Sequence, residues 1–325
     1  MARLEIASPE QIDTITRESY VLWGGGLSFE SYRDLWEEVA GTRWCRRHAS
    51  YQVWVDDDGE ILSSMKVYRP RMRLLDRVGI CSVFGAVFTP RSLRRRGYAS
   101  KMVEAGVAAA VERGDLAVVL FSDIGTRFYQ ELGFRTLPAL EQFGRLPGRP
   151  VRDSNLVIRP AKPDELEWIC RAHEASSAAR PVAVLRDIAH WEFLWIRSHS
   201  FFAKVHGAGV RHEWRVAFRG REFLGYLISV EGRGEWNVRE VGSIGGEVAE
   251  MAEILREAGG DAFRRGCRRV YGWLPDDLVR ALDDWSLRGR RRRRAIPMLR
   301  VDRASSALAA TIGSPSMHIP FQDQF

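Results

Sequence analysis

Four arginines and one glycine lie close together in the first third of the chain, directly after an apolar run. The group consists of Arg91, Arg94, Arg95, Arg96 and Gly97. A guanidinium is a forked cation that suits phosphate oxygens, and a glycine lets the backbone approach an anion closely. No acidic residue occurs between Asp76 and Glu104 to oppose a bound anion. The pattern predicts a phosphate-binding loop, with a solvated arginine turn as the alternative interpretation.

The elements on either side of this loop must position it. The apolar run at 83–88 predicts a strand that ends near Pro90, and a helical pattern extends from Gly97 to Arg113. The first N–H groups of a helix have no partner within the helix, and the helix dipole is positive at that end. A strand that ends in a basic loop and leads into a helix is therefore suited to binding a diphosphate.

A second motif follows further along the chain. An almost wholly apolar strand is predicted from Leu116 to Phe121, and after Ser122 and Asp123 the string Phe-Tyr-Gln-Glu-Leu-Gly-Phe occupies 128–134. Together with Arg-x-x-Gly-x-Ala at 94–99, this string resembles the two recurrent motifs of the GNAT superfamily of N-acetyltransferases. The segment 120–129 alone also resembles the fungal lysine N6-acetyltransferases.

The resemblance implies which residues bind an acyl-CoA donor, here acetyl-CoA. The backbone at the end of the strand would pair with the pantetheine arm, and the Phe88 N–H would face the thioester oxygen. The loop and the first helical turn would hold the diphosphate. The residues expected to contact the donor are Ala86, Val87, Phe88, Arg94, Arg95, Arg96, Gly97, Tyr98, Ala99, Ser100 and Ser122.

The resemblance also implies direct attack of a primary amine on the thioester. Such an amine has a pKa near 10.4 and must first lose a proton. Tyr129 matches the general acid for the leaving thiolate, with a core aromatic as the alternative interpretation. Asp123 is the candidate base or a helix cap, because the strand at 83–89 lacks the carboxylate that many relatives carry there. The Phe325 carboxylate is a further candidate, since the mycobacterial enhanced-intracellular-survival proteins, which share this tandem plan, use their C-terminus as a base.

After a Pro-Gly-Arg-Pro stretch at 147–150, the order of strands and helices repeats. We therefore predict an α/β fold with mixed sheets and two GNAT-like units in tandem: a catalytic domain at 1–147, a linker at 148–155, a second unit at 156–303 that includes a strand from Ile296 to Val301, and a tail at 304–325. Where the first unit has arginines, the second has Gly245, Gly246 and Glu247, and acids there repel a diphosphate. The second unit is therefore predicted to be degenerate, shaping the acceptor site or closing a sheet edge.

Composition limits the remaining possibilities. No apolar run is long enough to span a membrane, and the first residues contain no apolar signal-peptide core. The four cysteines are scattered and predict reduced thiols in a cytoplasmic protein. The seven histidines lack ligand spacing, so no metal is predicted. The net charge of +7 suits an anionic partner such as coenzyme A or a nucleic acid.

Three functions are compatible with these observations. The first is acetyl-CoA-dependent acylation of a small-molecule amine. The second is aminoacyl-tRNA-dependent transfer, which the arginine run at 290–294 would suit, although an exposed loop is the other interpretation of that run. The third is acyl-CoA binding without catalysis. The sequence identifies neither the acceptor nor an oligomeric state, because acceptor choice in such a fold depends on loops.

Overall fold

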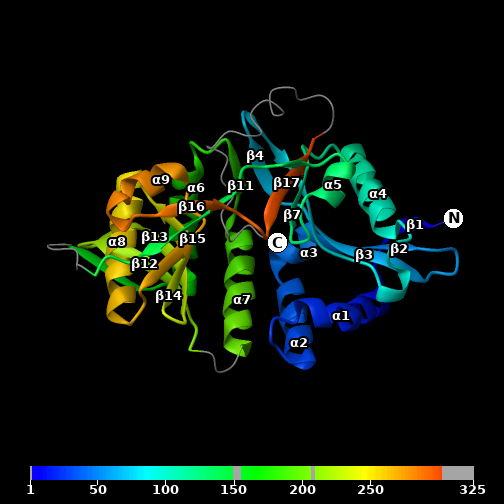
Figure 1. Cartoon of the computed structure of the whole chain (residues 1–325), viewed down its shortest axis with the longest axis horizontal. Helices are drawn as coiled ribbons and strands as arrows, with labels where there is room; N and C mark the ends of the chain where they lie inside the picture. Colours follow the sequence, from blue (N-terminus) through cyan, green and yellow to red (C-terminus); the bar gives the residue numbers. More distant parts are fainter. Residues whose placement is uncertain (1, 149–154, 206–208, 302–325) are drawn as a thin grey trace.

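Two seven-stranded sheets, each containing both parallel and antiparallel pairs, form the framework of the molecule (Figure 1). The structure is a computed structural model that describes residues 2–148, 155–205 and 209–301. In spatial order the first sheet consists of β1 (Arg3–Ile6), β2 (Ala49–Val55), β3 (Ile61–Tyr68), β6 (Ser82–Phe88), β7 (Val118–Ser122), β17 (Ile296–Arg300) and β8 (Arg135–Thr136). The second consists of β10 (Leu156–Pro160), β12 (Arg211–Arg219), β13 (Glu222–Gly232), β14 (Glu235–Ser243), β15 (Arg269–Gly272), β9 (Leu140–Arg145) and β16 (Arg288–Arg291). The predicted fold class is thereby confirmed.

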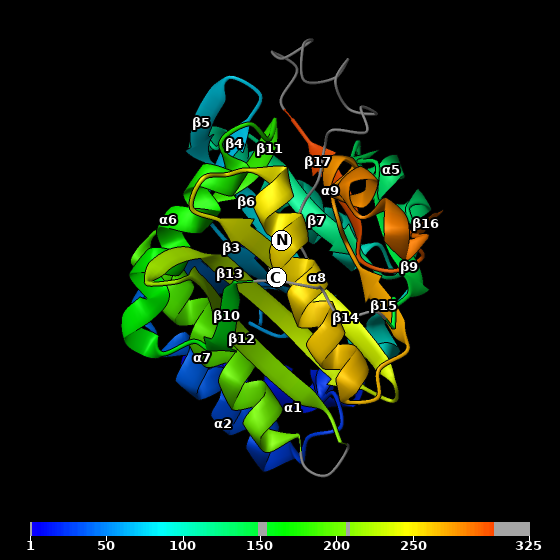
Figure 2. The same ribbon diagram turned by 90° about the vertical axis from the view of Figure 1, so that its left-hand side faces the viewer.

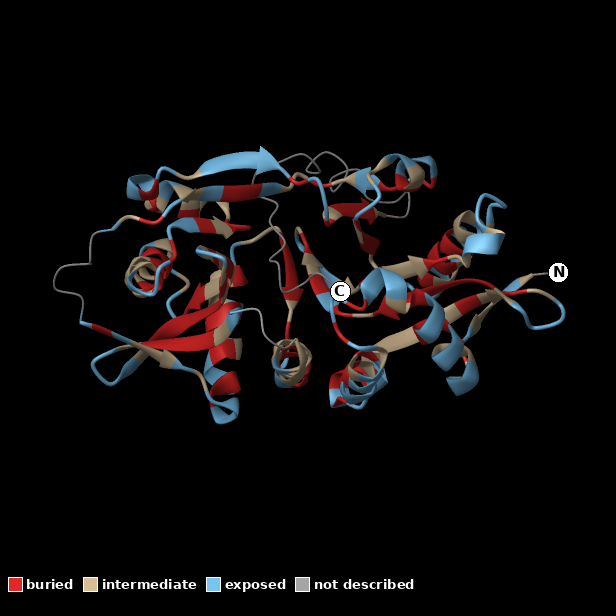
Figure 3. Cartoon of the chain, turned by 60° about the horizontal axis from the view of Figure 1, so that its bottom comes forward, coloured by how far each residue is buried: buried red, intermediate tan, exposed pale blue. Residues whose placement is uncertain are grey.

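Helices cover both faces of the first sheet. One face carries α1 (Pro9–Trp23), α2 (Phe29–Ala40) and α3 (Arg43–His48), and the other carries α4 (Tyr98–Glu112) and α5 (Arg127–Glu131) (Figure 1). The second sheet packs against α6 (Leu166–Ser177) and α8 (Val248–Arg264), and Figure 2 shows α8 crossing it. In both halves the buried residues gather on the strands and on the inner sides of the helices (Figure 3).

One of the hydrophobic clusters contains residues of both halves. Helix α7 (Ile188–Lys204) lies between them and packs against both α2 and α3. Trp44 of α3 stacks on His190 and Phe193 of α7, with ring centroids 4.1 and 4.8 Å apart. A three-stranded sheet of β4 (Arg71–Leu74), β5 (Arg77–Ile80) and β11 (Val182–Leu185) adds a second junction. Because aromatic rings bury large areas, this junction fixes the halves against each other.

The two large sheets also exchange strands. Strand β17, which we expected to complete the second unit, pairs instead with β7 of the first sheet, and that expectation is wrong. The segment between α5 and the linker also serves both sheets, because β8 belongs to the first sheet and β9 to the second. Apolar patterns indicate that a strand is buried but not which strand is its neighbour. The domain boundaries at 147, 155 and 303 stay a prediction, and the sheets themselves cross the first of them.

The elements near the arginine run are short. Helix α9 spans Asp276–Ala281, and a 3-10 turn follows it. The arginine run at 290–294, for which an exposed loop was one interpretation, contributes residues to the edge strand β16. The tail at 304–325, and with it Phe325, lies outside the described residues.

A buried polar cluster stabilises the second unit. The Glu240 carboxylate accepts hydrogen bonds from Arg186 (2.8 Å) and from the Tyr226 hydroxyl (2.8 Å), and His173 lies at 3.1 Å. Burial would raise the pKa of Glu240, but the positive charge of Arg186 and the His173 hydrogen bond outweigh burial and lower that pKa to about 2. The cluster therefore favours the ionised carboxylate.

Acid should weaken the fold through this cluster. A carboxyl whose pKa is lowered on folding stabilises the protein above its unfolded pKa of 4.5, and that stability is lost as the pH falls toward 2. We expect the urea midpoint of the wild type to fall between pH 5 and pH 2. Part of this fall should be missing in Glu240→Gln, a variant with a lower midpoint at neutral pH. Equal pH dependence in both proteins would contradict the assignment.

Candidate active site

The central feature of the first sheet is the point where β6 and β7 separate. The two strands pair in parallel only as far as Phe84 opposite Leu120. Beyond that point β6 continues to Phe88, with Ala86 at φ 47° and a register shift against β3. A bulge of this kind bends a strand and redirects its backbone groups. The backbone of Ala86, Val87 and Phe88 thus has no ladder partner in β7 and can pair with an extended ligand.

A basic loop follows directly after β6. A 3-10 turn at Arg91–Leu93 leads into it, and Arg94 Nε donates to the Thr89 carbonyl at 3.1 Å. The side chains of Arg94, Arg95 and Arg96 are exposed, and none of the ion pairs found among the described residues involves them. Three adjacent guanidinium groups are therefore available to a bound anion.

Helix α4 starts at this loop. Gly97 caps it in the left-handed region (φ 80°), no side chain caps it, and its first turn contains no acid. The N–H groups of Tyr98, Ala99 and Ser100 accordingly point out of the helix start. Its inner residues, including Met102 and Val103, are buried against the sheet and hold the helix in place. Loop and helix together have the geometry of an anion-binding helix start, and the diphosphate site stays a prediction.

Gly97→Ala tests the backbone conformation of this loop. A Cβ at Gly97 meets nothing within 4 Å, so the effect is purely conformational. An alanine in the left-handed region costs about 1–2 kcal/mol. The loop can avoid this cost by changing its backbone conformation, which turns the N–H groups away from the diphosphate. The affinity for acetyl-CoA should therefore fall about tenfold. Gly59→Ala is the control, since Gly59 has φ 84° and equally open surroundings in a distant turn. It should lower the unfolding midpoint without changing calorimetric affinity.

Tyr129 belongs to α5, the short helix that follows β7 in the chain. Its ring is 7% exposed and packs edge-on against Phe128 and Phe134. Its hydroxyl makes no hydrogen bond within the part of the chain that the structure describes. Burial, and to a smaller extent the charge of Asp123, raises the pKa of Tyr129 to about 12. The phenol is therefore protonated at any working pH and able to donate.

Ser122, the last residue of β7, and Asp123, which follows it, differ in their exposure and in their hydrogen bonds. Ser122 is buried, and its hydroxyl donates to the Gly125 carbonyl, so its side chain faces away from solvent. Asp123 is exposed and accepts the Ala295 N–H at 2.8 Å. Asp123 was expected to be either a base or a helix cap. It does not cap α5, because Thr126 is the cap residue of that helix. Asp123 instead attaches the segment before β17 to the end of β7.

One further carboxylate belongs to this region, and the sequence analysis missed it. A cavity of about 840 Å³ is lined by Glu18 and Leu22 of α1 together with Phe88, Arg91 and Arg94. Trp23 extends this wall, with its ring centroid 6.0 Å from that of Phe88. Strand β6 contains no acidic residue. The carboxylate in this cavity comes instead from Glu18 of α1. In the sequence, the only indication of a role for Glu18 is its position shortly before three glycines. The first of them, Gly24, caps α1, and its N–H donates to the Tyr20 carbonyl (2.7 Å).

The second unit repeats the strand pair but not the anion site. Strands β14 and β15 pair in parallel as far as Val238 opposite Gly272. At the start of α8, however, a Cβ on Gly246 would lie 2.8 Å from the Ala175 carbonyl oxygen, and one on Gly245 would lie 2.8 Å from the Glu250 carboxylate. A helix start that is covered by backbone and faces acids repels a diphosphate. This geometry agrees with the predicted degeneracy of the unit.

The described residues contain neither a metal-ligand cluster nor a membrane-spanning helix. Within residues 2–148, 155–205 and 209–301, no group of histidine, cysteine and acidic side chains could hold a metal ion. In those ranges no helix is both long and apolar enough to cross a bilayer. All four cysteines are free thiols.

Comparison with known proteins identifies the class. Residues 27–137 match the family described as "Acetyltransferase (GNAT) domain". The chain is 30% identical over 159 residues to a lysine acetyltransferase of Yarrowia lipolytica, a match that covers 41% of this chain and 40% of that protein. It thus spans less than half the length of this curated relative. Residues 27–137 of this chain are therefore a GNAT acetyltransferase domain, as the two motifs predict.

Solved structures extend the likeness to both units. A GNAT protein from Anabaena variabilis has a TM-score of 0.71 at 12% identity, with 93% of this chain and 73% of that chain covered. Eis1 from Mycobacterium abscessus has a TM-score of 0.59 at 15% identity, with 95% and 76% covered. At such identities the likeness concerns the fold alone. The predicted Eis-like tandem plan is confirmed at that level.

Proposed function

We propose that this chain transfers the acetyl group of acetyl-CoA to a primary amine of a small molecule. The observation that carries the proposal is the opening between β6 and β7, placed directly before three exposed arginines and the uncapped start of α4. The opening suits the pantetheine arm, and the helix start suits the diphosphate. The GNAT acetyltransferase domain at residues 27–137 supports the same donor.

The reaction we propose has one bond-forming step. The ammonium loses one proton to a base, and its nitrogen attacks the thioester carbon to give an oxyanion. As the oxyanion collapses, the C–S bond breaks, and the second proton of that nitrogen leaves with the thiolate, which departs as the CoA thiol. The Phe88 N–H, at the end of β6, stabilises the oxyanion. Tyr129 donates from its phenol to the departing thiolate. Asp123 is the candidate base among the described residues, and one of its oxygens already accepts the Ala295 N–H.

Glu18 is proposed to bind the ammonium form of the acceptor. It lies in the Phe88 cavity, where it is the one acid among the lining residues. Glu18 is exposed, so its ion pair with an ammonium should be worth about 0.2–1 kcal/mol. Glu18→Gln should therefore raise KM for the amine by up to about fivefold, while kcat changes less. Glu38→Gln, on the exposed side of α2, removes the same charge and should leave KM unchanged. An unchanged KM in Glu18→Gln would remove Glu18 from the acceptor site.

Two measurements test the proposed function together. Calorimetric titration with acetyl-CoA should give one saturable site per chain. A panel of amino acids, aminoglycosides and polyamines, followed by release of free thiol, should then identify acceptors. Binding without thiol release for any amine would favour a non-catalytic acyl-CoA-binding protein. Failure to bind acetyl-CoA would contradict the proposal.

Aminoacyl-tRNA is a second candidate donor, and one observation favours it. The edge strand β16 exposes Arg288 and Arg291, and Arg293 and Arg294 follow it on the surface just before β17 joins β7. Salt separates the two donors. Release of counterions from tRNA makes activity fall steeply between 50 and 200 mM salt, whereas one diphosphate gives a shallow slope.

A further inference from the structure

A second cavity lies under the first sheet, on the other side of α1 from the Phe88 cavity. It has a volume of about 320 Å³ and is enclosed by α1, α2, α3 and strands β2 and β3. Its apolar lining includes Ile12, Trp36, Val39, Cys45, Tyr51 and Tyr68. Residues 9–16 of α1 face this cavity, whereas residues 18–22 face the other. We call it the Lys66 cavity after the single cation in its interior.

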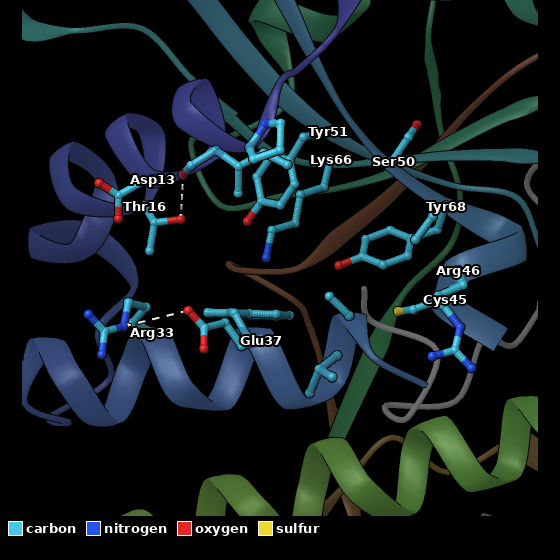
Figure 4. A pocket seen from close by; sticks show the side chains of 16 residues that line it. Asp13, Thr16, Arg33, Glu37, Cys45, Arg46, Ser50, Tyr51, Lys66 and Tyr68 are labelled. Carbon is cyan, nitrogen blue, oxygen red and sulfur yellow. Dashed lines mark hydrogen bonds and ion pairs between the residues drawn. The ribbon is translucent and has the colours of Figure 1, made fainter. Parts of the chain in front are cut away.

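Lys66 is buried there without an anionic partner. Its residue is 7% exposed, and its amino group lies 3.0 Å from the centre of the Trp36 ring and 5.0 Å from that of Tyr51. Among the residues that the structure describes, no carboxylate or carbonyl oxygen pairs with it. Figure 4 shows the Lys66 nitrogen and the Tyr68 hydroxyl pointing into the same space. Burial lowers the pKa of Lys66 to about 7, with Arg197 acting in the same direction and Cys45 opposing it.

The acids near the mouth of the cavity are already paired. Glu37 forms an ion pair with Arg33 (3.6 Å), and Asp13 forms one with Arg17 (3.1 Å). Arg46, also at the mouth, is exposed and takes part in none of the ion pairs found among the described residues. The uncompensated charge of the cavity is therefore positive, both inside and at its entrance.

The presence of a lysine at position 66 also indicates that this positive charge serves to bind a ligand. The chain contains only four lysines, at positions 66, 101, 162 and 204, whereas its other side-chain cations are arginines. A compact ammonium can bind one carboxylate and can also lose its proton when the cavity is empty. A purely structural interior position in this chain would be served by an apolar side chain at lower cost.

We propose that the Lys66 cavity binds a small organic monocarboxylate whose apolar part fills the aromatic walls and whose carboxylate pairs with the Lys66 ammonium. A phosphate group, with more oxygens to satisfy, would find too few donors among these walls. The site is separate from the proposed acyl-transfer cleft, but Lys66 lies opposite Gly85 in the β3–β6 ladder, next to the Ala86 bulge.

The test uses the full chain without acetyl-CoA, so its result is independent of the proposed function. Benzoate is titrated calorimetrically against benzamide, its neutral counterpart of the same shape. We expect one benzoate per chain, at least tenfold tighter binding of benzoate than of benzamide, and loss of that preference in Lys66→Met. Lys162→Met, which removes an exposed lysine of the second unit, should retain it.

The comparison of the two ligands in the wild type needs no variant and decides the matter even if Lys66→Met fails to fold. Equal affinity for benzoate and benzamide would reduce the site to an apolar cavity and overturn the proposal. Absence of binding by either compound, or undiminished benzoate binding by a folded Lys66→Met, would also overturn it.

Discussion

Replacing Arg94, Arg95 and Arg96 together by glutamine should weaken acetyl-CoA binding by about 10³-fold. The three guanidinium groups are exposed, adjacent and free of acidic neighbours in the described chain. A hydrogen bond to a charged group is worth about 1.5 kcal/mol at the lower end of its range, and 1.4 kcal/mol is a factor of ten. Three such bonds therefore account for the expected loss, which calorimetry would measure.

The control for this variant must remove three charges elsewhere. Arg221, Arg288 and Arg291 are exposed on the second unit, and their replacement by glutamine lowers the net charge equally. That control should leave acetyl-CoA affinity within a factor of two. If both triple variants lost affinity alike, binding would depend on overall charge. If neither did, the arginine loop would not be the diphosphate site.

Tyr129→Phe should lower kcat by about 10²-fold while leaving the acetyl-CoA affinity and the unfolding midpoint almost unchanged. The hydroxyl has no partner among the described residues, so its removal leaves no buried group unsatisfied. Because burial raises the pKa of Tyr129 to about 12, the phenol is a weaker acid than an alkyl thiol, and it acts mainly as a hydrogen-bond donor to the departing thiolate. A loss at the lower end of the range for general acids is thus expected.

The pH profile gives a second check on Tyr129. A group with a pKa of about 12 stays protonated as the pH rises from 7 to 10, so the wild-type kcat should not decline there through loss of the acid. Tyr271→Phe is the matched control, because the pKa of Tyr271 is also raised to about 12 by burial. Its hydroxyl donates to Glu141 of β9 in the second sheet, away from β6 and β7, so kcat should be retained. An unchanged kcat in Tyr129→Phe would remove Tyr129 from the mechanism.

The local parts of the proposed active site could be predicted from the sequence. The strand, the arginine loop, Gly97 and the helix after it are contiguous, and their signals come from residue types at short spacing. Tyr129 was placed by the same kind of contiguous string. In each case the physics is local: helix starts, left-handed glycines and apolar strands depend on neighbours within a few residues.

Contacts between distant segments could not be predicted in this way. The Ala295 N–H that binds Asp123 is 172 residues away, and no pattern near Asp123 announces it. Glu18 reaches Phe88 through the path of α1 across the sheet, and Lys66 meets Trp36 through the packing of α2. The pairing of β17 with β7 has the same character, because any exposed strand edge of suitable length could accept that strand.

The exchange of strands has a consequence for biosynthesis. A ribosome adds about 5–20 residues each second, and domains near the N-terminus usually fold while later residues are still being made. Here the first sheet cannot close until β17 at Ile296–Arg300 has emerged, and β7 presents an open edge in the meantime. Truncated chains ending before residue 296 should therefore aggregate rather than yield an active N-terminal fragment, and the polypeptide should mature as one body after synthesis of its last strand.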